Sequence, residues 1–191
     1  MGHGEKVLQF WFGEDFRRPD LKPQKKWFIK DDIFDQSVRE WFSGVYQQAT
    51  EGRFEDWMET AEGALALTIV LDQFPRNMFR DTPKAFASDA QALMVASQAI
   101  DRDFDQDVSP VMRVFFYVPF EHSENLANQH RCVELFQSLA TEPALKSYPE
   151  YALKHQAVIK QFGRFPHRNE ILGRTSTPEE LTFLQQPGSR F

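Results

Sequence analysis

The sequence contains a single cysteine, Cys132, in 191 residues, so the chain cannot close a disulfide on itself. It also lacks a long hydrophobic run, because the apolar stretch at residues 7–12 is too short for a secretory signal or a membrane span. Basic side chains are in deficit, since 22 Lys and Arg stand against 28 Asp and Glu and give a net charge of −6. These absences favour a cytoplasmic location and predict neither a nucleic acid nor a membrane as the main partner.

Motifs for several common chemistries are missing as well. The chain has no phosphate-binding loop, no GxGxxG, no paired cysteines and no HExxH. The acidic run at residues 101–107 resembles the start of a calcium loop, but Gln106 stands where that loop needs glycine, so we interpret the run as a solvated linker. Ser123 adjoins His122 but lacks the glycines of a nucleophile elbow. We therefore expect no metal and no cofactor.

What the sequence has instead is helical periodicity. Apolar residues recur with 3.6-residue spacing, and no window alternates for long, which predicts an all-α protein. Thr82-Pro83, Ser109-Pro110 and Thr177-Pro178 are typical helix starts. Residues 1–191 are predicted to form one domain, an antiparallel helical bundle or superhelix of about eight or nine helices. The predicted helices span residues 4–11, 23–30, 32–50, 54–74, 83–102, 110–118, 122–140, 143–162 and 178–186.

Two segments, 64–71 and 111–120, are apolar nearly all the way round and are predicted to lie at the centre of the domain. The 19 Phe and 4 Trp favour broad contacts between such helices. Charged residues come directly after each segment, beginning with Asp72 after the first and Glu121 after the second. A buried charge without a partner would cost several kcal/mol, so these groups must be paired or must face a polar site.

Charge also collects beside three prolines. The stretches Phe74-Pro75-Arg76-Asn77 and Phe165-Pro166-His167-Arg168-Asn169 are cationic, whereas Pro119 is followed by the largely anionic run 121–124. Because proline disfavours helix at the preceding residue, we expect the chain to turn a corner at each of the three prolines. Phe74 and Phe165, which precede two of them, are expected to leave the helical conformation. The opposite charges predict that these corners meet in space.

Two interpretations of this meeting are open. The first is a structural network, in which arginines form forks on the glutamates and Asn77 and Asn169 cap helices. The second is a pocket in which spare arginine donors hold a small anionic metabolite while a histidine or glutamate moves a proton. The candidate ligand-binding residues are Asp72, Arg76, Asn77, Arg164, His167, Arg168 and Asn169. The candidate catalytic residues are His122, Glu121, Glu124 and His155.

The histidines differ in what their neighbours indicate. His122 lies between two glutamates, which would orient its ring and raise its basicity. His155 shares the apolar face of its helix, so it is either a hydrogen-bonded core residue or part of the site. His167 lies among arginines and is expected to stay neutral.

Most of the chain resembles one known family. The similar strings share their order along the chain: VLQFWFG (7–13), DQFPRNMFR (72–80), AFASD (85–89), FFYVPFEHSE (115–124), FGRFPHRNEILGR (162–174) and STPEELTFL (176–184). They resemble the bacterial and fungal family catalogued as domain of unknown function 924. The resemblance implies a helical, tetratricopeptide-like superhelix and brings no activity with it.

Two function hypotheses therefore stand. One is a polar pocket for a small anionic molecule in an acid–base enzyme. The other is a tetratricopeptide-like scaffold that binds a peptide or protein without catalysis and exposes aromatic residues among Trp11, Trp27, Trp41 and Trp57. A protein partner or a homo-oligomer stays open under either hypothesis.

Overall fold

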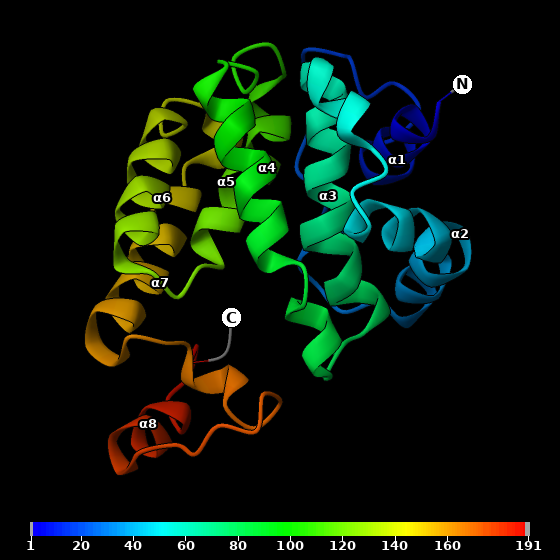
Figure 1. The fold of residues 1–191 in the computed structure, drawn as a ribbon. Helices are drawn as coiled ribbons and strands as arrows, with labels where there is room; N and C mark the ends of the chain where they lie inside the picture. The colour runs from blue at the N-terminus through cyan, green and yellow to red at the C-terminus, as the bar shows by residue number, and fades with distance from the viewer. Residues whose placement is uncertain (1, 190–191) are drawn as a thin grey trace.

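A computed structural model describes residues 2–189, and within that range the chain is built from helices without a β-strand (Figure 1). The α-helices are α1 (His3–Phe12), α2 (Asp32–Thr50), α3 (Ala61–Met78), α4 (Asp89–Asp101), α5 (Pro110–Glu121), α6 (Leu126–Ser138), α7 (Tyr148–Phe162) and α8 (Pro178–Leu184). Short 3-10 helices are η1 (Lys25–Trp27), η2 (Glu55–Glu59), η3 (Pro83–Phe86), η4 (Pro143–Leu145) and η5 (Pro166–Arg168). The predicted all-α class is confirmed. The tetratricopeptide-like label and the single domain over 1–191 stay predictions, and residues 1, 190 and 191 lie outside the described range.

Several predicted helices were too long. The segment 54–74 is divided at Thr60, whose hydroxyl caps α3 by accepting from the backbone N–H of Gly63. A side chain at position 63 would collide with the carbonyl of Trp57, so glycine is required where η2 meets α3. Likewise α6 begins at Leu126 because Asn125 caps it, and the predicted helix 23–30 shrinks to η1.

The expected proline corners were wrong at two of the three positions, because Pro75 and Pro119 lie inside α3 and α5. Proline removes the N–H that would bond the carbonyl four residues earlier, which for Pro75 is that of Leu71. Ser88, just before α4, supplies the missing donor, and its Oγ lies 2.6 Å from the Leu71 oxygen. Phe74 therefore stays helical. Only Pro166 begins a corner, with Phe165 extended at φ −88° and ψ 108°.

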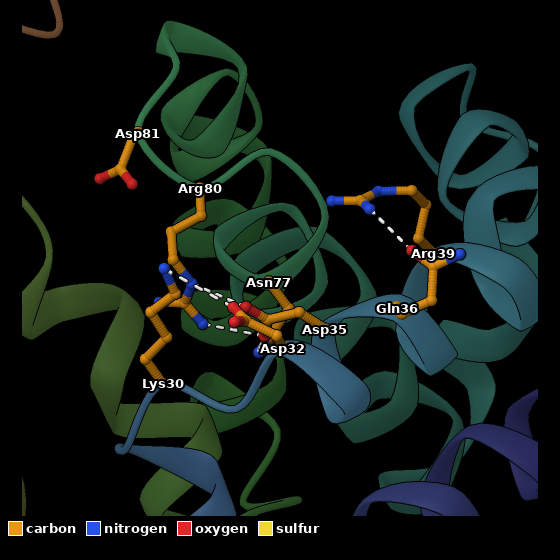
Figure 2. A pocket seen from close by; sticks show the side chains of 8 residues that line it. All are labelled: Lys30, Asp32, Asp35, Gln36, Arg39, Asn77, Arg80 and Asp81. Atoms are coloured by element: carbon orange, nitrogen blue, oxygen red, sulfur yellow. Dashed lines mark hydrogen bonds and ion pairs between the residues drawn. The ribbon is translucent and has the colours of Figure 1, made fainter.

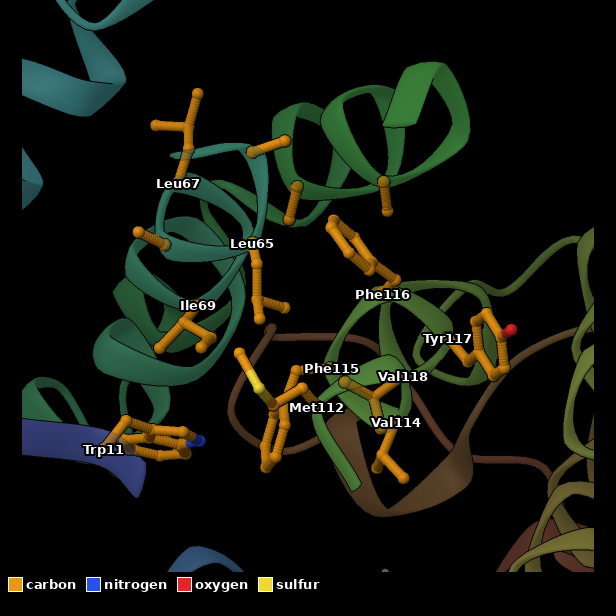
Figure 3. Packing of buried hydrophobic residues seen from close by; sticks show 14 of the residues in the cluster. Trp11, Leu65, Leu67, Ile69, Met112, Val114, Phe115, Phe116, Tyr117 and Val118 are labelled. Carbon is orange, nitrogen blue, oxygen red and sulfur yellow. The ribbon is translucent and has the colours of Figure 1, made fainter. Parts of the chain in front are cut away.

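The core forms around α3 and α5, as their apolar sequences predict. Helices α1, α2, α4 and α5 all contact α3, and α6 and α7 continue the array beyond α5 (Figure 1). Trp11 of α1 is fully buried, and its ring contacts Phe115 at 5.5 Å and Phe74 at 5.8 Å between centroids. Figure 3 shows Trp11, Phe115 and the aliphatic side chains of α3 filling the space between the helices. This packing fixes the ends of α3 and α5 relative to one another.

The C-terminal segment, residues 164–189, lies apart from the main core. Helix α7 ends at Gly163, whose left-handed φ of 69° turns the chain, and the segment then runs beneath the bundle (Figure 1). It has a small apolar cluster of its own, in which Phe165 packs with Val158 and Ile159 of α7. The segment thus brings η5 to the ends of α3 and α5.

Replacing Ser88 with alanine tests the repair of the helix at Pro75. The Leu71 carbonyl would lose its side-chain donor in a buried place, so we expect the free energy of unfolding to fall by about 1–3 kcal/mol. Ser109→Ala is the matched control, because the buried Ser109 hydroxyl has no hydrogen-bond partner in the described part of the chain. Urea unfolding measures both variants, and equal losses would contradict the proposed role of Ser88.

Candidate functional site

The predicted meeting of the three charged segments is observed. His122, after α5, contacts Asp72 of α3, with Nδ1 and Oδ1 2.8 Å apart. Arg168 of η5 faces Asp89 at the start of α4. Phe165 donates its backbone N–H to Glu124 Oε1 at 2.7 Å, which ties the C-terminal segment to the run after α5. We call Asp72, Arg76, Asp89, His122 and Arg168 the charged cluster.

Asp72 is the innermost member of the charged cluster and is fully buried. Its Oδ1 accepts from His122, its Oδ2 accepts from Gln73 at 2.7 Å, and Arg76 Nη1 lies 3.5 Å from Oδ1. Burial favours the neutral acid, but Arg76 and His122 outweigh it and hold the pKa of Asp72 well below its usual range. Asp72 is therefore a permanent anion at neutral pH.

The contact with Asp72 sets the chemistry of His122. A carboxylate only accepts, so Nδ1 of His122 carries the proton and Nε2 is left as the acceptor of the neutral ring. Burial and the nearby Arg76 guanidinium lower the pKa of His122, against the opposing pull of Asp72. His122 is thus oriented and neutral, which are the properties of a general base.

Arg76 is well paired within the protein, since three of its five N–H groups donate to Asp72 and Asp89. Its Nη1 and Nη2 donate to the two oxygens of Asp89 at 2.8 and 3.0 Å, and Nη1 also donates to the Asp72 carbonyl at 2.7 Å. The side chain stays 18% exposed, as does that of His122, so the charged cluster reaches the solvent on this side. The Arg76–Asp89 fork joins α3 to α4.

Arg168 differs from the other arginines of the predicted site. It is 7% exposed, and its guanidinium carbon lies 4.7 Å from the ring centroids of both Phe86 and Phe165. Its Nη1 is 3.5 Å from Asp89 Oδ2, too far for a good hydrogen bond, and its buried Nε has no acceptor among the described residues. Burial and Arg76 lower the pKa of Arg168 to about 10, so it is still charged at neutral pH.

Glu121 and His155 form a second buried pair beside the charged cluster. His155 Nδ1 donates to the Tyr151 carbonyl at 2.9 Å and lies 3.5 Å from Glu121 Oε1. Burial, and then the charge of Asp72, raises the pKa of Glu121 to about 8. Burial lowers the pKa of His155 to about 3. At neutral pH the pair is therefore an un-ionised acid beside a neutral imidazole.

Other predicted site residues have structural partners. Arg164 forms a fork on Glu180 at 2.6 and 2.8 Å, and Glu124 accepts a fork from Arg174 at 2.6 and 3.0 Å. The expected cap at Asn169 was wrong, because its Nδ2 donates to Glu180 and to Ser176 instead. These contacts fasten the C-terminal segment, and His167 packs against Phe165 within it.

Asn77 follows Arg76 in α3, but its side chain is directed at α2 and takes no part in the charged cluster. It does not cap a helix, because its Nδ2 donates to Asp35 Oδ1 at 2.7 Å, and Arg80 forms a fork on the same carboxylate. Figure 2 shows the side chains of Asn77 and Arg80 directed at Asp35. All three residues line a hollow of about 340 Å³. Arg164 borders another hollow of about 450 Å³, and neither hollow is lined by His122 or Arg168.

Two members of the site had no clear signal in the sequence. Asp89 stands in the first turn of α4, where an acidic residue is ordinary, and only the fold shows that it faces two arginines. Phe86 ends η3 and becomes informative only when Arg168 stacks on it. In the described range, no group of three or more His, Cys, Asp or Glu residues is arranged to hold a metal ion.

Fold and site together define an all-helical protein with a buried cluster of carboxylates and guanidinium groups at the ends of its two central helices. Residues 7–188 match the family model described as "Bacterial protein of unknown function (DUF924)", and the chain belongs to this family. Its fold is similar to that of a solved protein of unknown function, ATU0120 from Agrobacterium tumefaciens. The two are 41% identical, the match covers 95% of this chain and 96% of that one, and the TM-score is 0.85. No functionally curated protein matches the chain. Within residues 2–189 no helix has the length and apolarity needed to cross a membrane.

Replacing Glu121 with glutamine tests the buried acid through the pH dependence of stability. The native state keeps a proton on Glu121 up to a pKa of about 8, whereas the unfolded chain releases it near 4.5. This contribution to the stability of the natural chain is thus complete below pH 4.5 and is lost as the pH rises through 8. Glu121→Gln escapes that loss, so its stability relative to the natural chain should rise with pH, by at most about 1.4 kcal/mol per pH unit.

Glu124→Gln is the control with the opposite sign. Burial opposes the charge of Glu124, but the Arg174 fork outweighs it and lowers the pKa of Glu124 below 4.5. Its stabilisation is present at neutral pH and disappears in acid, so Glu124→Gln should be the less stable chain at pH 7 and should approach the natural chain as the pH falls. Denaturant unfolding from about pH 3 to about pH 8 measures both variants, since the Glu124 contribution is lost only below the unfolded pKa, and parallel pH profiles would contradict the assignment.

Proposed function

We propose that this protein binds a small anionic molecule at Arg168 and that His122 is the acid–base group beside it. The observation that carries the proposal is the state of Arg168, a buried guanidinium with a buried Nε that has no acceptor among the described residues. The hydrogen-bonding capacity of an oxyanion matches what Arg168 lacks.

The contrast with neighbouring arginines supports a ligand role for Arg168. Arg76, Arg164 and Arg174 each place two nitrogens on one carboxylate within hydrogen-bond distance. Both oxygens of Asp89 already accept hydrogen bonds from Arg76, so Arg168 makes only a long contact with Asp89. Leaving a charged donor buried and unsatisfied is costly, and proteins accept that cost mainly at binding and catalytic sites.

The geometry also supports access for a small molecule. Arg76, Asp89 and His122 form the partly exposed side of the charged cluster, with side chains about one-fifth exposed, while Arg168 lies deeper. An anion entering past Arg76 would meet two guanidinium groups that share one carboxylate. Of these two groups, Arg168 is the one with a buried N–H that lacks an acceptor among the described residues.

The titration states support proton transfer beside the anion. At neutral pH His122 can accept a proton at Nε2, whereas Glu121, the preceding residue, can donate one. Two titratable groups pushed toward opposite roles are characteristic of acid–base enzymes. The proposal therefore includes acid–base catalysis on the bound anion, with Asp72 as the positioning residue for His122.

A second candidate, the interaction scaffold, is favoured by one observation. Trp41 is 66% exposed, and Phe28, Ile29 and Ile33 of the same region are also exposed, whereas Trp11 and Trp27 are buried in the core. The hollow beside this region is lined by charged and amide side chains, without the aromatic residues that a peptide groove would offer. We therefore place the anion site first.

Replacing Arg168 with methionine separates a ligand-binding role from a structural one. Removing a buried charge that lacks hydrogen bonds should leave the melting temperature unchanged or higher in the absence of added anions. The same variant should lose the stabilisation that a panel of anions (acetate, nitrate, sulfate and phosphate) gives to the natural chain. Thermal unfolding followed by circular dichroism measures both effects.

Arg164→Met is the matched control, because Arg164 lies on the same segment but donates to Glu180. We expect it to lower the melting temperature while keeping the response to anions. The proposal fails if no anion stabilises the natural chain more than Arg168→Met, or if Arg168→Met unfolds at a much lower temperature without any anion.

A further inference from the structure

Resting on the proposed function, we infer that the anionic group held by Arg168 is a carboxylate, planar and singly charged, rather than a phosphate or sulfate dianion. Two features of the site restrict which kind of anion can bind there. One is the aromatic covering of the guanidinium, and the other is the number of carboxylates already present.

The covering of Arg168 restricts the direction from which a ligand can bind. Phe86 and Phe165 each lie with their ring centroids 4.7 Å from the guanidinium carbon. Because arginine stacks its flat guanidinium on aromatic faces, we take these rings to cover the flat faces of the group and to leave its edge for a ligand. A ligand group that accepts two parallel hydrogen bonds at that edge lies in the guanidinium plane. A carboxylate is planar and fits this arrangement with both oxygens.

A tetrahedral oxyanion fits the same edge less well. When two of its oxygens accept from the guanidinium edge, the remaining oxygens project out of that plane, into the space that a ring stacked on the guanidinium occupies. Aromatic faces carry partial negative charge and offer oxygen no hydrogen bond. The rings therefore favour a flat ligand group over phosphate or sulfate.

The charge of the site favours a single negative charge. The negative charges of Asp72 and Asp89 balance the positive charges of Arg76 and Arg168. The remaining member of the charged cluster, His122, is neutral. A monovalent ligand adds one charge to this balanced set. A dianion adds two, beside the carboxylate of Asp89, which lies 3.5 Å from the same guanidinium. Asp89 thus acts against doubly charged ligands.

The test compares small probes that separate shape from charge. Acetate and nitrate are planar and monovalent, methanesulfonate is monovalent but tetrahedral at sulfur, and sulfate is tetrahedral and divalent. Each is titrated against the natural chain and against Arg168→Met, and the difference in melting temperature between the two chains gives the Arg168-dependent affinity. This difference removes general salt effects, since both chains experience the same solution.

We expect acetate and nitrate to bind at least about tenfold more tightly than sulfate, a difference of about 1.4 kcal/mol, with methanesulfonate between them. Equal or tighter Arg168-dependent binding of sulfate overturns the inference and leaves the proposed function standing. Methanesulfonate binding as tightly as acetate overturns the role of the aromatic rings. The absence of any Arg168-dependent binding overturns both proposals.

Arg168→Lys keeps the inference testable if the methionine variant does not fold. Lysine keeps the positive charge but lacks the planar fork, so it should weaken acetate and nitrate by a larger factor than sulfate. An equal loss for all probes would show that only the charge of Arg168 matters, which contradicts the carboxylate assignment.

Discussion

A carboxylate in the middle of the most buried helix has to be compensated where it stands, and Asp72 is that group. Arg76, one turn later in α3, lies beside it, Gln73 donates to one of its oxygens, and His122 arrives from the end of α5 to donate to the other. The packing of α3 against α5 is therefore both apolar and electrostatic, and the tautomer of His122 follows from it. Had Asp72 been apolar, nothing in this region would need His122 to face inward.

The charges that surround Asp72 serve two purposes, and the structure divides them by how well each is paired. The forks of Arg164 on Glu180 and of Arg174 on Glu124 fasten the C-terminal segment, and in each fork both carboxylate oxygens accept from the arginine. The fork of Arg76 on Asp89 joins α3 to α4. The fastened segment also places Arg168 in the charged cluster, where the nearest carboxylate, Asp89, is already paired with Arg76. Under the proposed function, a structural network and a binding site are parts of one arrangement, in which the paired groups hold the poorly paired Arg168 in place.

Much of the fold was predictable because its signals are local. Periodicity, the apolar composition of 64–71 and 111–120, and the helix start at Thr177-Pro178 all predict what is observed. The corner at Pro75 was mispredicted because its repair comes from Ser88, a contact that no local pattern shows. In the site, the meeting of the three segments was predictable from charge at the ends of buried helices, whereas the assignments within it were not. Asn77 donates to Asp35 and Arg164 donates to Glu180. These partners could not be predicted, since helical phase and long-range packing decide which carboxylate an amide or a guanidinium contacts.

The most direct test of this account is a high-resolution crystal structure of the natural chain grown with acetate as the principal anion. The account predicts a carboxylate lying in the plane of the Arg168 guanidinium, accepting from its edge, with Arg76 still on Asp89 and His122 still on Asp72. It would be contradicted by an Arg168 that donates two good hydrogen bonds to Asp89 or to another protein carboxylate, with no anion at its edge. In that case the charged cluster would be a structural network throughout.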